Sequence, residues 1–395
     1  MSVSHGLDSS CQSTSTDDAE FDVTSLLNML GEVVDRRGAR GKVYGLTFVL
    51  AASLVAVLAG AKNFQEIADQ VADFPPSLLR KLGGVWCWFQ RKFRAPSKDT
   101  IRRVLTNVDA AAFDLAVGAW LHERVSRSSN GLLRLAIDGK VLCGAWTAEN
   151  EQFTLFSAMI HSEGVTVAQV QVPADTNEIT QVKALLDSVS ARDGDRVVVT
   201  MDAAHTQRDT AEYLAGTRGF DYVMTCKGNQ PTLLKSIFYK AVPLVRTPPH
   251  HLVEERGHGR ISHWSTWITD ADVISFPHAR QIGCIRREVF DLDGQRVSKE
   301  YAWIITNATP EHAQAIDLHD YVRGQWGIEN KSHYVRDTTW REDAHQARTG
   351  SGPQAMATLR NLAAGLLRLN GHHAIKRTTE AICRDRTRAL PLLTT

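Results

Sequence analysis

Two apolar segments in the middle of the chain each run directly into an aspartate. In LLRLAID, residues 132–137 lead into Asp138, and in RVVVTMD, residues 197–201 lead into Asp202. Short apolar runs of this kind are typical of strands buried on both faces of a sheet. A carboxylate at the end of a buried strand is unfavourable unless positive charge meets it, and ligands collect at strand ends of open α/β sheets. Two such acids on neighbouring strands therefore favour a divalent cation between them, and Mg²⁺ suits carboxylates, water and phosphate oxygens.

Each aspartate also has an ordinary structural interpretation. Asp138 precedes Gly139 and is compatible with a turn, and Asp202 is compatible with a helix N-cap. Each interpretation is sufficient for one residue alone, but the repeated pattern favours a shared site.

A third acid is expected on a helix that packs beside these strands. We choose Glu329 in GQWGIENKSHYVRD, because His333 and Arg336 follow it at i+4 and i+7 and would share its helical face. Glu342 and Asp343 remain rival acids, and a surface i,i+4 pair is the ordinary alternative.

The order of the predicted elements indicates an α/β fold. From residue 131, three strands in a meander are followed by a helix, a strand, a helix and a strand, which is the order of a ribonuclease-H-like core. We predict these divisions of the chain: a disordered acidic tail (1–23), an all-helical, helix-turn-helix-like DNA-binding domain (24–126), a ribonuclease-H-like catalytic domain (127–372) with a β-rich insertion at about 245–306, and a C-terminal tail (373–395).

The net charge of +1 conceals a local basic segment. Between Arg80 and Arg103 there are eight basic residues and one acid, with tryptophan and phenylalanine interleaved, which is typical of a nucleic-acid-binding face. The alternative is a solvated face over a tryptophan-rich core. The residues predicted to bind DNA in this segment are Arg91, Lys92, Arg94, Lys98, Arg102 and Arg103.

Residues 43–61 contain no charged side chain and nearly reach the length of a membrane span. Their high content of small residues and the lack of a second such segment favour a buried helix, so no membrane partner is expected. The six dispersed cysteines form no C-x-x-C pair, and no signal peptide opens the chain, which favours a reducing cytoplasm.

Several motifs in order resemble those of the DDE transposases of bacterial insertion sequences, in the branch of H-repeat-associated proteins. They are AIDGKVL, TNEIT, VVVTMDAAHTQ, DYVMTCKGNQPTLL, WGIENKSHYVRDTTWRED and ARTGSGPQAMATLRNLAAGLLRL. The resemblance implies that Asp138, Asp202 and Glu329 are the catalytic, metal-binding triad, with two Mg²⁺ ions for which Mn²⁺ can substitute. Cys143 and Lys331 depart from the family pattern without touching the triad.

The same resemblance implies DNA contacts near the scissile phosphate. The candidates are Lys140, Lys227, Asn229, Gln230, Arg323, His333 and Arg336, with turn or cap chemistry as the alternative for Asn229 and Gln230. Arg323 lies further from Glu329 than the family pattern expects. Tyr301 or Trp303 could stack on an unpaired base, with core packing as the alternative.

The implied activity is that of a DNA transposase in the bacterial cytoplasm, associated with the nucleoid when bound to DNA. It would bind the terminal inverted repeats as a homodimer, cleave them and join the 3′-OH to target DNA. Two alternatives are a domesticated protein that only binds DNA, and a metal-dependent nuclease without strand transfer.

Overall fold

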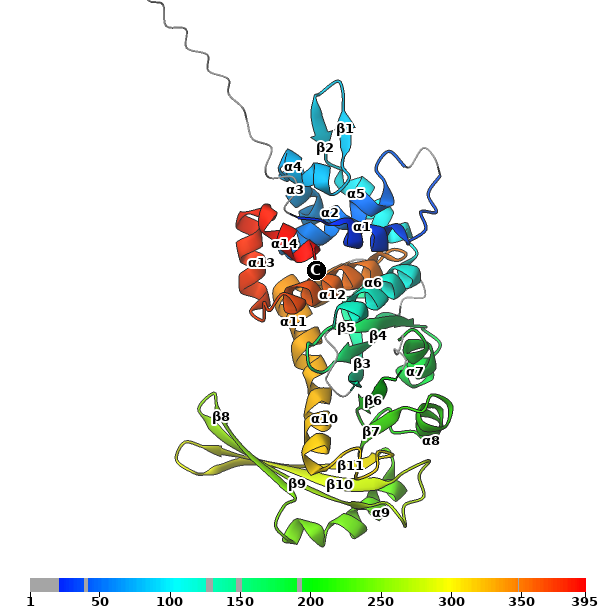
Figure 1. Ribbon diagram of the computed structural model, residues 1–395, viewed down its shortest axis with the longest axis vertical. Helices are drawn as coiled ribbons and strands as arrows, with labels where there is room; N and C mark the ends of the chain where they lie inside the picture. The colour runs from blue at the N-terminus through cyan, green and yellow to red at the C-terminus, as the bar shows by residue number, and fades with distance from the viewer. Residues whose placement is uncertain (1–20, 39–41, 126–130, 147–150, 190–193, 347) are drawn as a thin grey trace, which may run out of the picture.

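One mixed sheet of nine strands forms the centre and one end of the molecule (Figure 1). The computed structural model describes residues 21–38, 42–125, 131–146, 151–189, 194–346 and 348–395. The strands are β3 (Leu132–Trp146), β4 (Gln152–Ile160), β5 (Thr166–Val172), β6 (Arg196–Met201), β7 (Asp221–Cys226), β8 (His251–Gly257), β9 (Arg260–Asp270), β10 (Gln281–Asp291) and β11 (Arg296–Thr306). Their order across the sheet is β5-β4-β3-β6-β7-β11-β10-β9-β8.

The first five strands confirm the ribonuclease-H-like α/β core. β4 runs antiparallel to both β3 and β5, while β3, β6 and β7 run parallel. Helix α7 (Glu178–Asp187) connects β5 to β6, and α8 (Arg208–Glu212) lies between β6 and β7. This is the predicted sequence of elements, because apolar runs of four to eight residues bounded by turns identify buried strands.

The predicted β-rich insertion is present and belongs to the same sheet. β11 pairs antiparallel with β7, and β10, β9 and β8 follow outward. This pairing satisfies backbone groups of β7 that would otherwise form an open edge. Helix α9 (Pro231–Ala241) packs on β9, β10 and β11, and α10 (Ala315–Ile328) crosses the sheet over β3.

The N-terminal region is mainly helical. Its helices are α1 (Thr24–Gly31), α2 (Leu46–Leu58), α3 (Phe64–Ala72), α4 (Pro76–Lys81), α5 (Lys98–Asn107) and α6 (Ala110–Arg124). The prediction of an all-helical domain is wrong in one place, because β1 (Val85–Cys87) and β2 (Lys92–Arg94) form an antiparallel hairpin. The second strand, Lys92–Arg94, alternates basic and aromatic side chains with the period of a strand.

Helix α2 is the buried helix predicted from the uncharged segment. Every residue of α2 except Thr47 is buried, and the helix packs against α1, α3 and α12. Among the described residues, no single helix has the length and apolar character needed to cross a bilayer; α5 and α6 meet that test only as a pair, bent by 86°.

Residues 373–395 are not the predicted tail. α13 (Ile375–Arg384) and α14 (Leu390–Leu393) follow α12 (Gly352–Leu369), and Ile382 and Leu393 are buried in the core that also contains α2. Helix α12 packs against α6, α2 and α5, so both ends of the chain build one helical layer (Figure 1). The predicted acidic tail (1–23) rests on residues 1–20, which lie outside the described residues.

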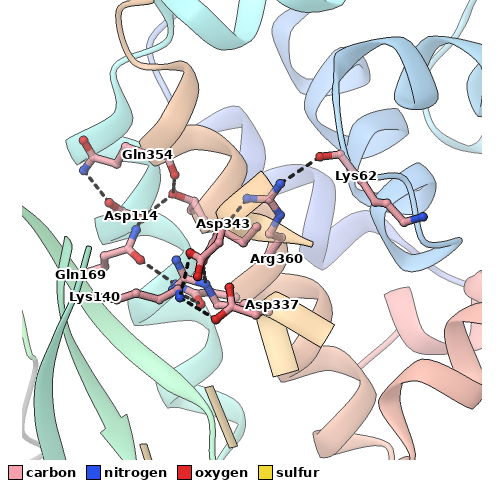
Figure 2. A network of polar contacts seen from close by, with 12 residues as sticks. Lys62, Asp114, Lys140, Gln169, Asp337, Asp343, Gln354 and Arg360 are labelled. Atoms are coloured by element: carbon pink, nitrogen blue, oxygen red, sulfur yellow. Dashed lines mark hydrogen bonds and ion pairs between the residues drawn. The ribbon is translucent and has the colours of Figure 1, made fainter. Parts of the chain in front are cut away.

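A buried carboxylate between two arginines joins the helices at the centre of this layer. Glu342 accepts hydrogen bonds from Arg336 at 2.7 Å and from Arg360 at 2.8 Å, and all three side chains are only 1% exposed. Burial acts to raise the pKa of Glu342, but the charges of Arg336 and Arg360 outweigh it and hold the pKa at about 2. Arg360 also donates to the carbonyl of Lys62, as Figure 2 shows.

A second buried carboxylate, Asp114 on α6, lies in the same polar network (Figure 2). It accepts hydrogen bonds from Gln169 on β5 and from Gln354 and Thr358 on α12. Burial raises the pKa of Asp114 to about 6 in spite of these donors. The network therefore joins the helical layer to the edge of the sheet.

We predict that Glu342→Gln destabilises the protein by about 3–5 kcal/mol, because the variant leaves two buried guanidinium groups without a counter-charge. Urea unfolding followed by circular dichroism measures the change. Glu380→Gln on α13 is the matched control, since Glu380 is exposed, and it should change stability by less than about 0.5 kcal/mol. Equal unfolding midpoints for the two variants would contradict the structural role of Glu342.

Candidate active site

The register of two parallel strands places Asp138 and Asp202 side by side. The last paired residues of β3 and β6 are Ala136 and Thr200, and each aspartate follows two residues later in the chain. Asp202 comes directly after β6, as predicted. β3 does not end at Asp138, however, because its pairing with β4 continues through Asp138 and the strand runs to Trp146. Asp138 therefore lies where β3 loses its pairing with β6.

Glu329 faces the same pocket as these aspartates. Asp138, Asp202 and Glu329 line a cavity of about 460 Å³. Side chains from β7, from the strands of the insertion and from α10 complete the lining, among them Lys227, Trp264, Arg287, Glu300, Tyr301 and Trp326. The structure thus brings together the three acids that were predicted from separate parts of the sequence.

Gln325 fixes the helix of Glu329 on the two strands. Its amide donates to the carbonyl of Ile137 at 2.9 Å, directly before Asp138. Its side-chain oxygen accepts from the Thr200 hydroxyl at 2.7 Å, two residues before Asp202. His161 lies 2.9 Å from the same hydroxyl. Because Gln325 and Thr200 are both buried, the side chains have no water to replace these bonds, and α10 is held in one position.

The carboxylates repel one another. Burial raises the pKa of Asp138 to about 7, and the negative charges of Asp202 and Glu178 act in the same direction. One oxygen of Asp202 accepts hydrogen bonds from the backbone of Ala204 and His205, at 3.0 and 3.4 Å. These bonds close a turn, whereas the next helix, α8, begins at Arg208 with Gln207 as its N-cap, so the predicted helix N-cap role of Asp202 is wrong.

The donor set fits a divalent cation. Among the described residues, no three His, Cys, Asp or Glu side chains lie close enough to hold a metal ion as they stand. The pocket nevertheless offers carboxylate oxygens, which Mg²⁺ prefers. Burial, together with the negative charges of Asp202 and Glu178, raises the pKa of Asp138 there. A cation between Asp138, Asp202 and Glu329 would act in the opposite direction.

Sequence analysis missed Glu178 as a site residue. Its carboxylate lies against Gly139, where a Cβ atom would come within 1.7 Å of Oε1, so Gly139 leaves room for a fourth acid beside Asp138. Nε2 of His205 is 3.5 Å from the Glu178 carboxylate, and the His205 ring stacks on Phe156. The available signal was the TNEIT motif, in which Glu178 follows the N-cap residue of a helix.

Three residues predicted to contact DNA are buried instead. Lys140 is 8% exposed and pairs with Asp337 at 2.8 Å and Asp343 at 3.2 Å. Arg336 is held by Glu342 in the buried cluster. For these two residues the prediction is wrong, because neither cation is accessible to a phosphate.

His333 is the third buried residue. It lies 3.7 Å from the Asp138 carboxylate, and burial, together with the charges of Arg336 and Lys140, lowers the pKa of His333 to about 3. A neutral buried ring does not attract a phosphate, so the predicted DNA contact is wrong. The π-helical turn Glu329–His333 inserts an extra residue, which turns the residues after it, Arg336 among them, away from the face of Glu329.

The remaining candidates near the pocket have separate roles. Arg323 forms a bidentate pair with Glu255 at 2.5 and 3.0 Å and lies over the Trp264 ring, so it joins α10 to the insertion. Asn229 donates to the carbonyl of Ala203, as its turn alternative expects. Lys227 is exposed at the pocket.

Three further candidates are Gln230, in the loop after β7, and the aromatic residues Tyr301 and Trp303. Gln230 donates to Gln207 at 3.1 Å, which supports the loop after Asp202. Tyr301 lines the pocket and is 43% exposed, and it stacks on Trp303. Trp303 packs in turn on Phe238, so Tyr301 is the better placed of the two for a base.

The basic residues of the N-terminal region are exposed. Arg91, Lys92 and Arg94 belong to the β1–β2 hairpin, and Lys98, Arg102 and Arg103 belong to α5. The structure leaves these six side chains accessible to a large anionic partner.

We predict that Asp138→Asn stabilises the metal-free protein at pH 7.5. In the folded protein the Asp138 carboxyl has a raised pKa of about 7, against an ordinary value of 3.8. The contribution of Asp138 to wild-type stability therefore falls as the pH rises from about 4 to 7, because its carboxyl ionises freely only in the unfolded chain. In EDTA at pH 7.5 the variant should gain about 2 kcal/mol or a few degrees in melting temperature, and the gain should vanish at pH 4.

Mg²⁺ should raise the melting temperature of the wild type and not that of the variant, because a cation bound only to the folded state stabilises it. Asp175→Asn, at an exposed acid before α7, is the control and should behave as the wild type does. A lower melting temperature for Asp138→Asn than for the wild type in EDTA would show that the carboxylate is compensated within the protein.

Comparison with known proteins identifies a family for this chain. A family model described as "Transposase DDE domain" matches residues 136–366, and one described as "DDE_Tnp_1-associated" matches residues 27–121. "Putative transposase YncI" of Escherichia coli O157:H7 is 27% identical over 364 residues, which cover 88% of each chain. "H repeat-associated putative transposase YhhI" of Escherichia coli K12 is 23% identical over 358 residues, 88% of this chain and 91% of that one.

One solved structure is similar at low identity. The piggyBac transposase in a synaptic complex with hairpin DNA is 11% identical, with a TM-score of 0.45, over 96% of this chain and 82% of that chain. The match of the DDE family model covers more than half of the chain and spans all three acids of the pocket. The chain therefore belongs to the DDE transposase family.

Proposed function

We propose that the protein binds the ends of an insertion sequence, cleaves them by metal-dependent hydrolysis of a phosphodiester, and joins the new 3′-OH to target DNA. The observation that carries this proposal is the convergence of Asp138, Asp202 and Glu329 on one pocket. Membership of the family and the names of its relatives support it.

The three acids would hold two Mg²⁺ ions, for which Mn²⁺ can substitute. When bound, such a pair activates the attacking water, polarises the phosphate and stabilises the leaving 3′ oxygen. The strands would keep the carboxylates of Asp138 and Asp202 in fixed positions. Gln325 fixes the helix that presents Glu329. The same arrangement serves both steps, because hydrolysis and strand transfer are both in-line displacements at phosphorus.

Other pocket residues would position the DNA. The Lys227 ammonium group is exposed at the pocket and would attract the phosphate backbone. The exposed face of Tyr301 would support a base beside the scissile phosphate. The exposed basic residues of the β1–β2 hairpin and α5 would bind duplex DNA of the element's ends, and two ends would be held by a homodimer.

Two other activities are compatible with the same family and remain as alternatives. A nuclease without strand transfer would need the same three acids, and a domesticated protein would bind DNA without cutting it. A joining assay with a pre-cleaved labelled end and a supercoiled plasmid as target separates them, because only a transposase transfers the label to the plasmid.

We predict that Asp138→Asn, Asp202→Asn and Glu329→Gln each lower Mg²⁺-dependent nicking of a labelled terminal fragment by more than about 10³-fold, while DNA binding is retained. Their effects should be non-additive, because the ligands act as one unit. Glu300→Gln is the matched control, since Glu300 lines the same pocket from β11, and it should retain activity within about tenfold. Normal nicking by Glu329→Gln would place the third ligand elsewhere.

A further inference from the structure

The β1–β2 hairpin projects from the helical layer at the end of the molecule opposite β8–β11 (Figure 1). Its two strands pair Trp86 with Phe93 and Cys87 with Lys92. The turn between them contains Trp88 and Phe89, and Arg91 adopts a left-handed conformation with φ of 47°. The hairpin is therefore a defined short ribbon with two aromatic residues at its tip.

Those two aromatic side chains are presented to solvent. Trp88 is 83% exposed and Phe89 is fully exposed, whereas Trp86 contacts Phe93 at 5.0 Å between ring centroids. Scattered exposed apolar residues are common, but two adjacent large rings at a projecting tip mark a binding surface. The partner must offer an apolar or π surface that a narrow ribbon can reach.

The partner must also be anionic. Residues 83–95 contain Arg91, Lys92 and Arg94 and no acidic residue. All three cations are exposed, and none forms an ion pair within the part of the chain that the structure describes. The hairpin therefore combines unused positive charge with unused aromatic surface.

The positive charge continues from the base of the hairpin onto α5. Arg94 and Arg103 line a pocket of about 680 Å³ together with Arg36 and Arg37. Arg36 pairs with Asp109, and Arg37 with Asp35, both at less than 3 Å. Arg94 and Arg103 have no acidic partner among the described residues. Their guanidinium groups can therefore bind a phosphate next to the hairpin.

We propose that the hairpin enters a groove of duplex DNA and wedges Trp88 and Phe89 between base pairs, which kinks the duplex. A two-stranded ribbon fits a DNA groove, and apolar side chains inserted at a base step unstack it. Arg91 and Lys92 contact the flanking phosphates, and Arg94 and Arg103 contact the next ones. This inference rests on the proposed function. It adds a second contact with the duplex, away from the proposed cleavage pocket.

The test compares the full-length wild type with Trp88→Ala/Phe89→Ala, using a 30-base-pair duplex of mixed sequence with a fluorophore at each end. Energy transfer between the dyes reports bending, and fluorescence anisotropy reports affinity at several salt concentrations. The aromatic variant should bind about 10- to 100-fold more weakly and lose the bend. Its salt dependence should be unchanged, because no phosphate contact is removed.

Arg91→Gln/Lys92→Gln/Arg94→Gln should have the complementary effect. Its logarithmic salt slope should fall by about 2–3, since each lost phosphate contact removes about 0.9 from the slope. Val273→Ala/Leu292→Ala is the matched control, because both side chains are exposed and apolar, 72% and 73%, and lie in the β8–β11 half. This control should bind and bend DNA as the wild type does.

Three results would overturn the proposal. The first is wild-type affinity and bending by Trp88→Ala/Phe89→Ala; normal nicking of terminal DNA by that variant would then leave the proposed function intact. The second is that the same variant loses self-association in sedimentation velocity while its DNA affinity is unchanged, which would make the hairpin a contact between copies of this chain. The third is that Trp88→Ala/Phe89→Ala loses binding to phosphatidylserine vesicles while its DNA binding is unaltered, which would make the hairpin a membrane contact. A wild type that neither binds nor nicks DNA would instead refute the proposed function.

Discussion

The buried hydrogen bonds of Gln325 hold the parts of the pocket together. Gln325 contacts the carbonyl before Asp138 and the hydroxyl of Thr200, two residues before Asp202. Glu329 lies four residues further on, at the end of the same helix. Since neither strand nor helix can move without breaking a bond that water does not replace, the three acids keep their relative positions. Under the proposed function, fixed positions of this kind are what a metal site would require.

The helix beyond Glu329 is fixed by charge. Glu342 lies between Arg336 and Arg360, and Arg360 reaches the carbonyl of Lys62 in the N-terminal region. The helix that carries Glu329 and the helical layer are therefore parts of one packed body. A buried carboxylate with two arginine partners contributes little net stability when complete but is costly to break. The cluster therefore specifies one arrangement of the helices rather than strengthening the fold.

Positive charge is divided between two uses that the sequence does not distinguish. Lys140 and Arg336 neutralise buried acids, whereas Arg91, Lys92 and Arg94 remain in solvent. All five were candidate DNA contacts by residue type and position. Burial separates them, because a cation that already has a carboxylate partner in the core has no accessible donor for a phosphate.

The sequence by itself determined the order of elements in the core and singled out the two aspartates, because short runs of apolar residues that lead into an acid are a local pattern. Its motifs also pointed to the family. Only the tertiary structure decided the remainder. The π-helical turn Glu329–His333 turned Arg336 inward, and Gly139 admitted Glu178 beside Asp138. β3 continued past Asp138 because β4 was there to pair with it, and residues 373–395 became helices because α2 and α12 offered an apolar surface. These outcomes depend on contacts between segments far apart in the chain, which no local pattern encodes.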